Sequence, residues 1–473
     1  MNTKKPNISR RNFLKKFTVV GATTAATLVG CRDASKQIIS GTASHGDVPV
    51  DKMTYRTSNS GDRVSLLGYG CMRWPTKPDP NNEDNKIIDQ DGVNQLVDYA
   101  LAHGVNYFDT APPYCQGASE KATGIALSRH PRNSYFLATK MSNQRFAGQG
   151  LSPKQMFDKS VEMYRNSFSQ LQTDYFDYYL MHIVGMGDDS MAMLNERFFD
   201  NGLLDFLLRE REQGRIRNLG FSYHGDVRVF DYLLSRHDEF KWDFVQIQLN
   251  YVDYRHASGI NFNAEYLYNE LNRRNIPAVV MEPLLGGRLA SMPEFLIQRL
   301  KSRRPDDSLA SWAFRFCGTF PRVLTVLSGM TYMEHLQDNI CTYSPLDPCT
   351  DEELALLEEN ASKFAEFPLV PCTACQYCMP CPYGVNIPAI FSHYNKCLNE
   401  GNVVNGSDDS NYARARRVYL VGYDRSVPKL RQASHCIGCG KCMPHCPQSI
   451  AIPDELHRID AYVESLRQER FDE

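Results

Sequence analysis

Residues 105–114 read V-N-Y-F-D-T-A-P-P-Y, and this stretch decides the fold. Its first part, residues 105–110, is an apolar run that predicts a buried strand, and two prolines follow it. A helical pattern precedes the run at residues 92–103, and another follows at residues 118–128. A strand flanked by helices is the unit from which parallel sheets are built, so the stretch predicts an α/β fold.

The same unit recurs between residues 55 and 340. Further strands are predicted at residues 65–70, 135–139, 175–181, 216–222, 244–249, 278–281 and 323–327, and further helices at 153–171, 203–213, 227–235, 264–274 and 334–339. Eight strands alternating with helices in under 300 residues favour a (β/α)8 TIM barrel. The alternative is a doubly wound open sheet, which the lack of G-x-G-x-x-G after the first strand disfavours.

The segments on either side of this repeat complete the predicted organisation. Residues 54–65 form a candidate hairpin that closes the barrel floor. Thr350 and Glu353 fit a capping box that starts a helix, and Pro368 and Pro371 follow it. We therefore expect the barrel at residues 53–345, a linker helix at 346–371 and a small domain at 372–473, with helices at 387–398 and 412–421.

The N-terminus resembles an export signal. Residues 9–15 read S-R-R-N-F-L-K, and an apolar run of 14 residues follows at 17–30. This run is short for a membrane span, which needs roughly 20 residues. It ends in L-V-G-C, which resembles a lipoprotein cleavage site at Cys31. These features predict a twin-arginine signal at residues 1–31, a tether at 32–52, and a lipid-anchored protein on the periplasmic side of the membrane.

The cysteines indicate metal rather than disulfides. Of 15 cysteines, eight lie in two runs, C-T-A-C-Q-Y-C-M-P-C-P at 372–382 and C-I-G-C-G-K-C-M-P-H-C-P at 436–447. The second run has the C-x2-C-x2-C-x3-C-P spacing of bacterial ferredoxins, whose fourth cysteine binds the other cluster. We expect two [4Fe–4S] clusters, one held by Cys372, Cys375, Cys378 and Cys446, the other by Cys436, Cys439, Cys442 and Cys381. Structural zinc is the alternative, but it needs neither the third cysteine nor the closing proline.

Four polar residues follow barrel strands at the end where TIM-barrel active sites lie: Asp109, Tyr114, Lys140 and His182. An ammonium beside a phenol lowers the pKa of that phenol, and a carboxylate can hold the ammonium in place. An imidazole can orient a carbonyl oxygen. Together these groups can protonate a carbonyl oxygen as hydride arrives, or remove the proton in the reverse direction.

The barrel sequence resembles the aldo/keto reductase family. The matching stretches are D-T-A-P-P-Y-C-Q-G-A-S-E (109–120), A-T-K-M (138–141), L-M-H (180–182), L-G-F-S-Y (219–223), Q-I-Q-L-N-Y (246–251), E-P-L-L-G-G-R-L (282–289) and L-S-G-M-T-Y-M-E-H-L-Q-D-N (327–339). The resemblance implies that Tyr114 is the general acid/base, that Lys140 and Asp109 tune it, and that His182 positions the substrate oxygen.

The resemblance also implies a nicotinamide cofactor. The positions that would hold it are Ser222 and Gln246 for the carboxamide, Leu284, Gly286 and Gly287 for the pyrophosphate, and Ser328, Gly329 and Asn339 for the adenosine end. The loop after the eighth strand lacks the Lys or Arg of NADP-preferring members, which favours NAD over NADP. Met281 stands where many members stack an aromatic ring on the nicotinamide.

These features predict an oxidoreductase that moves hydride between a nicotinamide cofactor and a carbonyl or alcohol substrate. The clusters would relay electrons to or from a membrane or periplasmic redox partner. Since iron–sulfur clusters are assembled in the cytoplasm, the twin-arginine route for folded proteins suits this chain, and the nucleotide would be loaded before export too. The alternatives are a binding scaffold with an electron-transfer module, and an ordinary reductase with structural clusters. The net charge of −3 gives no footprint for nucleic acid.

Overall fold

A computed structural model describes residues 47–187 and 189–468 of the chain. The predicted signal, the lipid site at Cys31 and most of the tether lie outside these residues. Within the described part, no helix is long and apolar enough to cross a membrane.

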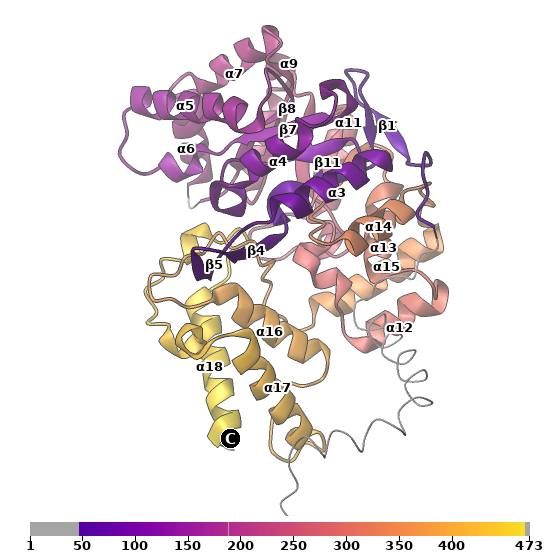
Figure 1. Cartoon of the computed structure of the whole chain (residues 1–473), viewed down its shortest axis with the longest axis vertical. Coiled ribbons are helices and arrows are strands. Elements are labelled where there is room, and N and C mark those ends of the chain that lie inside the picture. Colours follow the sequence, from indigo (N-terminus) through magenta and orange to yellow (C-terminus); the bar gives the residue numbers. More distant parts are fainter. Residues whose placement is uncertain (1–46, 188, 469–473) are drawn as a thin grey trace, which may run out of the picture.

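Eight parallel strands close into a barrel, as the alternating pattern predicts (Figure 1). Their order around the barrel is β3 (Leu67–Gly70), β6 (Tyr107–Asp109), β7 (Phe136–Met141), β8 (Phe176–Val184), β9 (Ile216–Tyr223), β10 (Phe244–Gln248), β11 (Ala278–Met281) and β12 (Val323–Ser328). The barrel closes where β12 pairs with β3, with Val326 opposite Leu67. This closure confirms the TIM-barrel prediction and excludes the open sheet.

The predicted N-terminal hairpin lies at the floor of the barrel. It pairs β1 (Tyr55–Thr57) with β2 (Arg63–Ser65) in antiparallel fashion. Val64 is fully buried and packs with Tyr107, Tyr178 and Phe244 inside the barrel. The hairpin thereby seals the end of the barrel opposite the carboxyl ends of the strands, so the site can open only at the other end.

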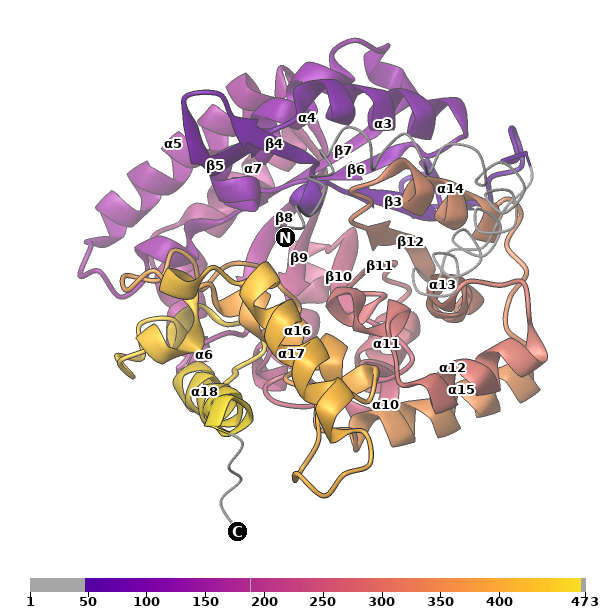
Figure 2. The same ribbon diagram turned by 60° about the horizontal axis from the view of Figure 1, so that its bottom comes forward.

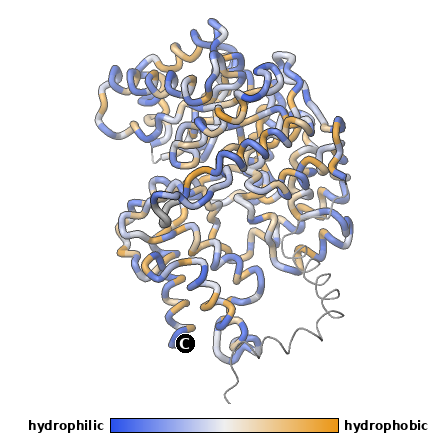
Figure 3. The backbone as a smooth tube through the Cα atoms, in the orientation of Figure 1, coloured by the Kyte–Doolittle hydropathy of each residue, from blue (hydrophilic) through white to orange (hydrophobic). Residues whose placement is uncertain are grey.

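Helices surround the barrel, and each predicted one is present. They are α3 (Gln90–Ala102), α4 (Ser119–Leu127), α5 (Pro153–Leu171), α7 (Leu203–Glu212), α8 (Val227–Ser235), α11 (Ala264–Arg273) and α14 (Met333–Thr342). The tube in Figure 3 alternates between hydrophilic and hydrophobic along these outer helices, as expected for helices with one buried face. Shorter elements are β4 (Thr76–Asp79), β5 (Asn82–Ile88), α6 (Ser190–Leu194), α9 (His237–Phe240) and α10 (Asp253–His256).

Two barrel helices between β11 and β12 were not predicted, α12 (Glu294–Arg303) and α13 (Leu309–Thr319). Helix α13 reads L-A-S-W-A-F-R-F-C-G-T, and eight of its residues are buried. A helix that is apolar on most sides shows no helical period in its sequence, which explains the omission.

The connector after the barrel is α15 (Asp351–Ala365), and it begins with the predicted capping box. The Thr350 side chain accepts a hydrogen bond from the Glu353 backbone, and the Glu353 side chain accepts one from the Thr350 backbone. Leu357, Ala361 and Phe364 are buried in the same core as the barrel. The connector is therefore packed on the barrel rather than free.

The cysteine-rich region has its own core, built by α16 (Ile387–Asn399), α17 (Tyr412–Ser426) and α18 (Ile452–Gln468). Figures 1 and 2 show these helices grouped at one side of the barrel. None of the described residues from 372 onward lies in a strand, which confirms the mainly helical prediction. Helix α18 was not predicted.

Candidate active site and cysteine loops

The carboxyl ends of the barrel strands surround a cavity of about 380 Å³. Asp109, Tyr114, Lys140 and His182 all line it. The predicted nucleotide positions line it too: Ser222, Gln246, Leu284, Gly286, Gly287, Ser328, Gly329 and Asn339. The closed barrel thus brings together residues that are more than 200 positions apart in the sequence.

A buried ion pair joins the second and third barrel strands. Lys140 Nζ lies 2.5 Å from Asp109 Oδ1 and donates a second hydrogen bond to the Thr110 carbonyl at 2.7 Å. The pair forms because Asp109 and Lys140 end neighbouring strands in parallel register, Asp109 opposite Ala138. Burial lowers the pKa of Lys140 and raises that of Asp109, and in each case the partner's charge opposes the shift.

Tyr114 lies beside this pair, in the short helix η2 (Tyr114–Gly117) after β6. Lys140 Nζ stands 4.8 Å from the centre of the Tyr114 ring. The sequence argument expected the ammonium to lower the pKa of Tyr114. In the structure the pKa of Tyr114 is instead raised well above its ordinary value, mainly by burial and next by Tyr377. The phenol therefore keeps its proton in this closed site, and giving it up requires Lys140 to stabilise the phenolate.

His182 lies two residues before the end of β8 and faces the Tyr114 ring edge-on, with ring centres 6.0 Å apart. Its Nδ1 is held by the Ser142 hydroxyl at 2.6 Å. Burial, with the Lys140 charge next, lowers the pKa of His182 well below its ordinary value. A neutral imidazole with one nitrogen already bonded can use the other nitrogen to orient an oxygen in the cavity.

The cavity has the polar groups that a nicotinamide requires. Gln246 Oε1 is buried and has no hydrogen-bond partner among the described residues, so it can accept a carboxamide N–H. Ser222 Oγ accepts the backbone N–H of Ile183, which leaves its own hydrogen free to donate. Asn339 Nδ2 donates to Ser328 Oγ at 3.0 Å. The residues present therefore fit the predicted group.

Two charged residues of the cavity were missed by the sequence argument, Arg73 and Glu282. The side chain of Arg73 packs against Gly329, where a Cβ would lie 3.0 Å from Arg73 Cδ. A cation thus does stand beside the loop after the eighth strand, supplied by the segment after the first. Glu282 lines the cavity at φ +54°, and burial raises its pKa while Arg73 opposes the rise. Only the closure of β12 on β3 reveals these neighbours.

The eight cysteines of the two runs form two groups in space. Burial, followed by the charges of Cys375, Cys372 and Cys446, raises the pKa of Cys378 to about 12, so these four thiols lie close together. Cys442 is affected in the same way by Cys436, Cys381 and Cys439. These are the two sets that the swapped ferredoxin arrangement predicts.

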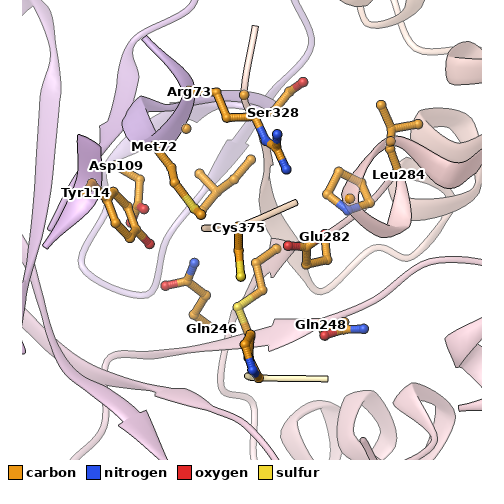
Figure 4. A pocket seen from close by; sticks show the side chains of 18 of the residues that line it. Met72, Arg73, Asp109, Tyr114, Gln246, Gln248, Glu282, Leu284, Ser328 and Cys375 are labelled. Atoms are coloured by element: carbon orange, nitrogen blue, oxygen red, sulfur yellow. The ribbon is translucent and has the colours of Figure 1, made fainter. Parts of the chain in front are cut away.

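The cysteine loops also form the roof of the cavity. The same cavity as Tyr114 is lined by Cys375 and Tyr377 from the first run, by Pro447 at the end of the second run, and by Gln448 after it. Figure 4 shows Cys375 among barrel side chains, between Tyr114 and Glu282.

The first cysteine loop contacts the barrel at two points, the segment after β3 and the predicted pyrophosphate loop. Arg73 donates to the Thr373 carbonyl at 2.5 Å. Gly286, at φ +69°, touches Thr373 so closely that a Cβ there would collide with it. The roof and the predicted nucleotide loop are therefore one packed unit.

Comparison with known proteins agrees with both parts of the chain. Residues 66–361 match the aldo/keto reductase family, and residues 371–452 match a 4Fe-4S dicluster domain. Protein tas of Escherichia coli strain K12 is 26% identical over 326 residues, which are 60% of this chain and 91% of tas. L-galactose dehydrogenase of Arabidopsis thaliana is 24% identical over 323 residues, 64% of this chain and 92% of that one. The solved thermostable aldo-keto reductase Tm1743 superposes with a TM-score of 0.50 at 20% identity, covering 65% of this chain and 100% of its own.

Proposed function

Since the chain belongs to the aldo/keto reductase family and carries a 4Fe-4S domain, we propose that it moves hydride between a nicotinamide nucleotide and a carbonyl or alcohol substrate. The nucleotide would supply or accept the hydride. Gln246 and Ser222 would hold its carboxamide, Leu284, Gly286 and Gly287 its pyrophosphate, and Ser328, Gly329 and Asn339 its adenosine end. We favour NAD on the sequence of the eighth loop, although Arg73 adds a cation nearby.

The proton step falls to the four residues at the strand ends. His182, neutral and held by Ser142, would orient the substrate oxygen. Tyr114 would give its proton to that oxygen, and Lys140 would stabilise the phenolate that remains, while Asp109 holds the ammonium. The raised pKa of Tyr114 keeps the phenol protonated in the resting site, and the same four residues would serve the reaction in either direction.

One observation supports a role for the clusters in this chemistry: Cys375 and Tyr114 line the same cavity. Two [4Fe–4S] clusters, bound by the two cysteine groups described above, would supply one-electron transfer there. Oxidation of an alcohol releases two electrons, and two clusters together can take them one each.

The packing of Thr373 on Gly286 also supports a nucleotide that stays bound. A loop that cannot open would hold the nucleotide as a recycled group, as needed outside the cytoplasm. We propose on the sequence alone that the chain is exported by the twin-arginine route and anchored by lipid at Cys31.

The first test is the nucleotide content of anaerobically isolated protein. NAD(H) or NADP(H) released on denaturation in near-equal amount to the chain supports the proposal and names the cofactor. Protein that neither contains nor binds either nucleotide would contradict it.

The second test is Tyr114→Phe, with the exposed Tyr332→Phe as control. Transfer from reduced nucleotide to a panel of small aldehydes and ketones should fall about 100- to 10,000-fold in the first variant, the usual contribution of a general acid. It should be unchanged in the control. Full activity in Tyr114→Phe would leave the barrel as a binding scaffold.

A further inference from the structure

The two cysteine groups differ in their access to solvent. Cys446 of the first group is buried, and Cys375 faces the cavity. Cys439 of the second group is exposed. The cluster nearer the barrel is thus enclosed, and the other one is at the surface.

Large apolar side chains are exposed around the second group. Ile437 is 62% exposed and lies between Cys436 and Cys439 in the chain. Met443, 46% exposed, follows Cys442, and Tyr383, also 46% exposed, lies two residues after Cys381. We call these residues, together with Leu430, the apolar patch.

Leu430 is the most exposed member of the patch, at 80%. Its segment is next to that of Tyr383, because the Asn386 backbone N–H donates to the Arg431 carbonyl at 2.9 Å. Four exposed apolar side chains next to one cluster's ligands are more than the scatter of single residues normal for a protein surface.

The same surface is positively charged. Residues 425–453 contain Arg425, Lys429, Arg431 and Lys441 and no Asp or Glu. Lys429, Arg431 and Lys441 are exposed, and no ion pair is found for them in the part of the chain that the structure describes. On the packed helices, Asp424 forms an ion pair with Arg467, Glu455 forms one with Arg458, and Asp460 lies near Glu464 and Arg467.

We propose that this surface docks a one-electron carrier protein whose own redox centre is surrounded by acidic residues. The proposal rests on the relay function above and names its partner. Long-range attraction would speed the encounter, and the apolar patch would make the short contact from which the electron passes. Each encounter oxidises or reduces the exposed cluster by one electron, so a two-electron turnover uses two carrier molecules.

A protein partner fits this surface better than a membrane does. Peripheral binding to lipid uses an amphipathic helix with a long apolar face. Here the apolar side chains stand on loops and short turns, such as η7 (Lys429–Arg431) and η9 (Met443–His445). A small patch with a charged rim is typical of transient electron-transfer contacts.

The test compares the full holoprotein with Lys429→Glu/Arg431→Glu/Lys441→Glu. The matched control is Lys121→Glu/Lys159→Glu/Arg165→Glu, which makes the same charge change on exposed residues of α4 and α5. The clusters are first reduced with dithionite, so no hydride chemistry is needed. Their oxidation by an acidic [2Fe–2S] ferredoxin, and by a basic c-type cytochrome, is then followed by stopped flow at several salt concentrations.

The wild type should react with the acidic carrier faster at low salt than at high salt. The triple variant Lys429→Glu/Arg431→Glu/Lys441→Glu should react about tenfold or more slowly, and its rate should depend little on salt. The control should match the wild type. Leu430→Ser should slow the reaction while leaving its salt dependence unchanged. Equal rates in the wild type and both triple variants, or a wild-type rate with the acidic carrier that does not fall as salt is raised, would overturn the proposal.

Two further results separate this inference from the proposed function. Charge-dependent oxidation by the acidic carrier in a protein without hydride transfer would sustain the docking surface and contradict the proposed function. If instead the Lys429/Arg431/Lys441 triple variant lost only its binding to phosphatidylserine vesicles, and the rate at which the carrier oxidises its clusters were unchanged, the surface would be a membrane contact and the proposal would fail.

Discussion

The barrel mouth and the cysteine loops form one cavity, but they hold their functional side chains in different ways. In the barrel, Asp109, Lys140 and His182 lie at or near the ends of strands whose positions are fixed by backbone pairing. In the loop around Cys375 no strand is present, and Ala374 and Gln376 adopt positive φ. The barrel half is therefore placed by its backbone, whereas the cysteine half depends on what its thiols bind.

Because of this difference, a substitution in the barrel and a substitution in the cysteine loops should have different consequences. A change in the barrel alters charges that are already buried and paired. A change in the cysteine loops removes a metal ligand, and the roof over the cavity loses the group that orders it. Three substitutions test this contrast, beginning with the largest expected effect.

Replacing Lys140 by Met should abolish most activity and destabilise the barrel. Both members of the pair are nearly fully buried, with 1% and 3% of their side chains exposed. Removing one partner of a buried ion pair costs about 3–5 kcal/mol, because the other charge is left unpaired. Hydride transfer should fall at least about 100-fold, since Tyr114 loses its neighbouring cation.

The matched control is the double variant Asp109→Asn/Lys140→Met, which removes both charges. Its unfolding free energy in urea should recover most of the loss, and its activity should not. If the single and double variants were equally stable, the pair would not be a buried charge interaction in solution.

Replacing Cys375 by Ala should loosen the roof and leave the barrel folded. Iron should fall from about eight to about four atoms per chain, because one cluster loses a ligand. The nucleotide loop then loses its packing on Thr373, and nucleotide release should quicken by about tenfold or more, which is about 1.4 kcal/mol.

Cys397→Ala is the control, because Cys397 is buried outside both runs. Iron content, nucleotide release rate and circular dichroism are compared in the two variants. An unchanged release rate in Cys375→Ala, with iron lost, would show that the cluster does not order the roof. Loss of helical signal from the barrel would contradict the independence of the two halves.

The features that could be predicted from the sequence lie within the barrel or within the cysteine runs. The barrel strands and the ion pair could be predicted because strand patterns are local and parallel strands end at one edge. The two cysteine groups could be predicted because the runs resemble those of ferredoxins, in which the fourth cysteine of each run binds the other cluster. Helix α13 could not, because it is apolar on most sides.

The contacts across the cavity could not be predicted either. Arg73 meets Gly329 only because the barrel closes, and Tyr377 lines the cavity only because the cysteine loops pack on the barrel. The raised pKa of Tyr114 also depends on this roof, since burial is its main cause. Sequence spacing shows which groups are near in the chain, but not how much water the other half excludes.

The last of the three effects is absent at neutral pH and develops only on acidification, and His224 at the barrel mouth contributes to it together with His182. Burial lowers the pKa of His224 from 6.5 to about 4. Between about pH 6.5 and pH 4 the unfolded chain binds a proton that the folded chain does not, so stability should fall as the pH falls through this window. Each unit of pKa difference contributes about 1.4 kcal/mol.

His224→Asn should flatten this part of the stability profile, measured by urea unfolding from pH 7 to pH 4. The exposed His457→Asn, in the cysteine-rich region, is the control and should leave the profile as in the wild type. A profile that is equally steep in His224→Asn would mean that the barrel mouth is open to water in solution. In that case the roof formed by the cysteine loops would not close the cavity, and the barrel mouth and the cysteine loops would both be exposed to solvent.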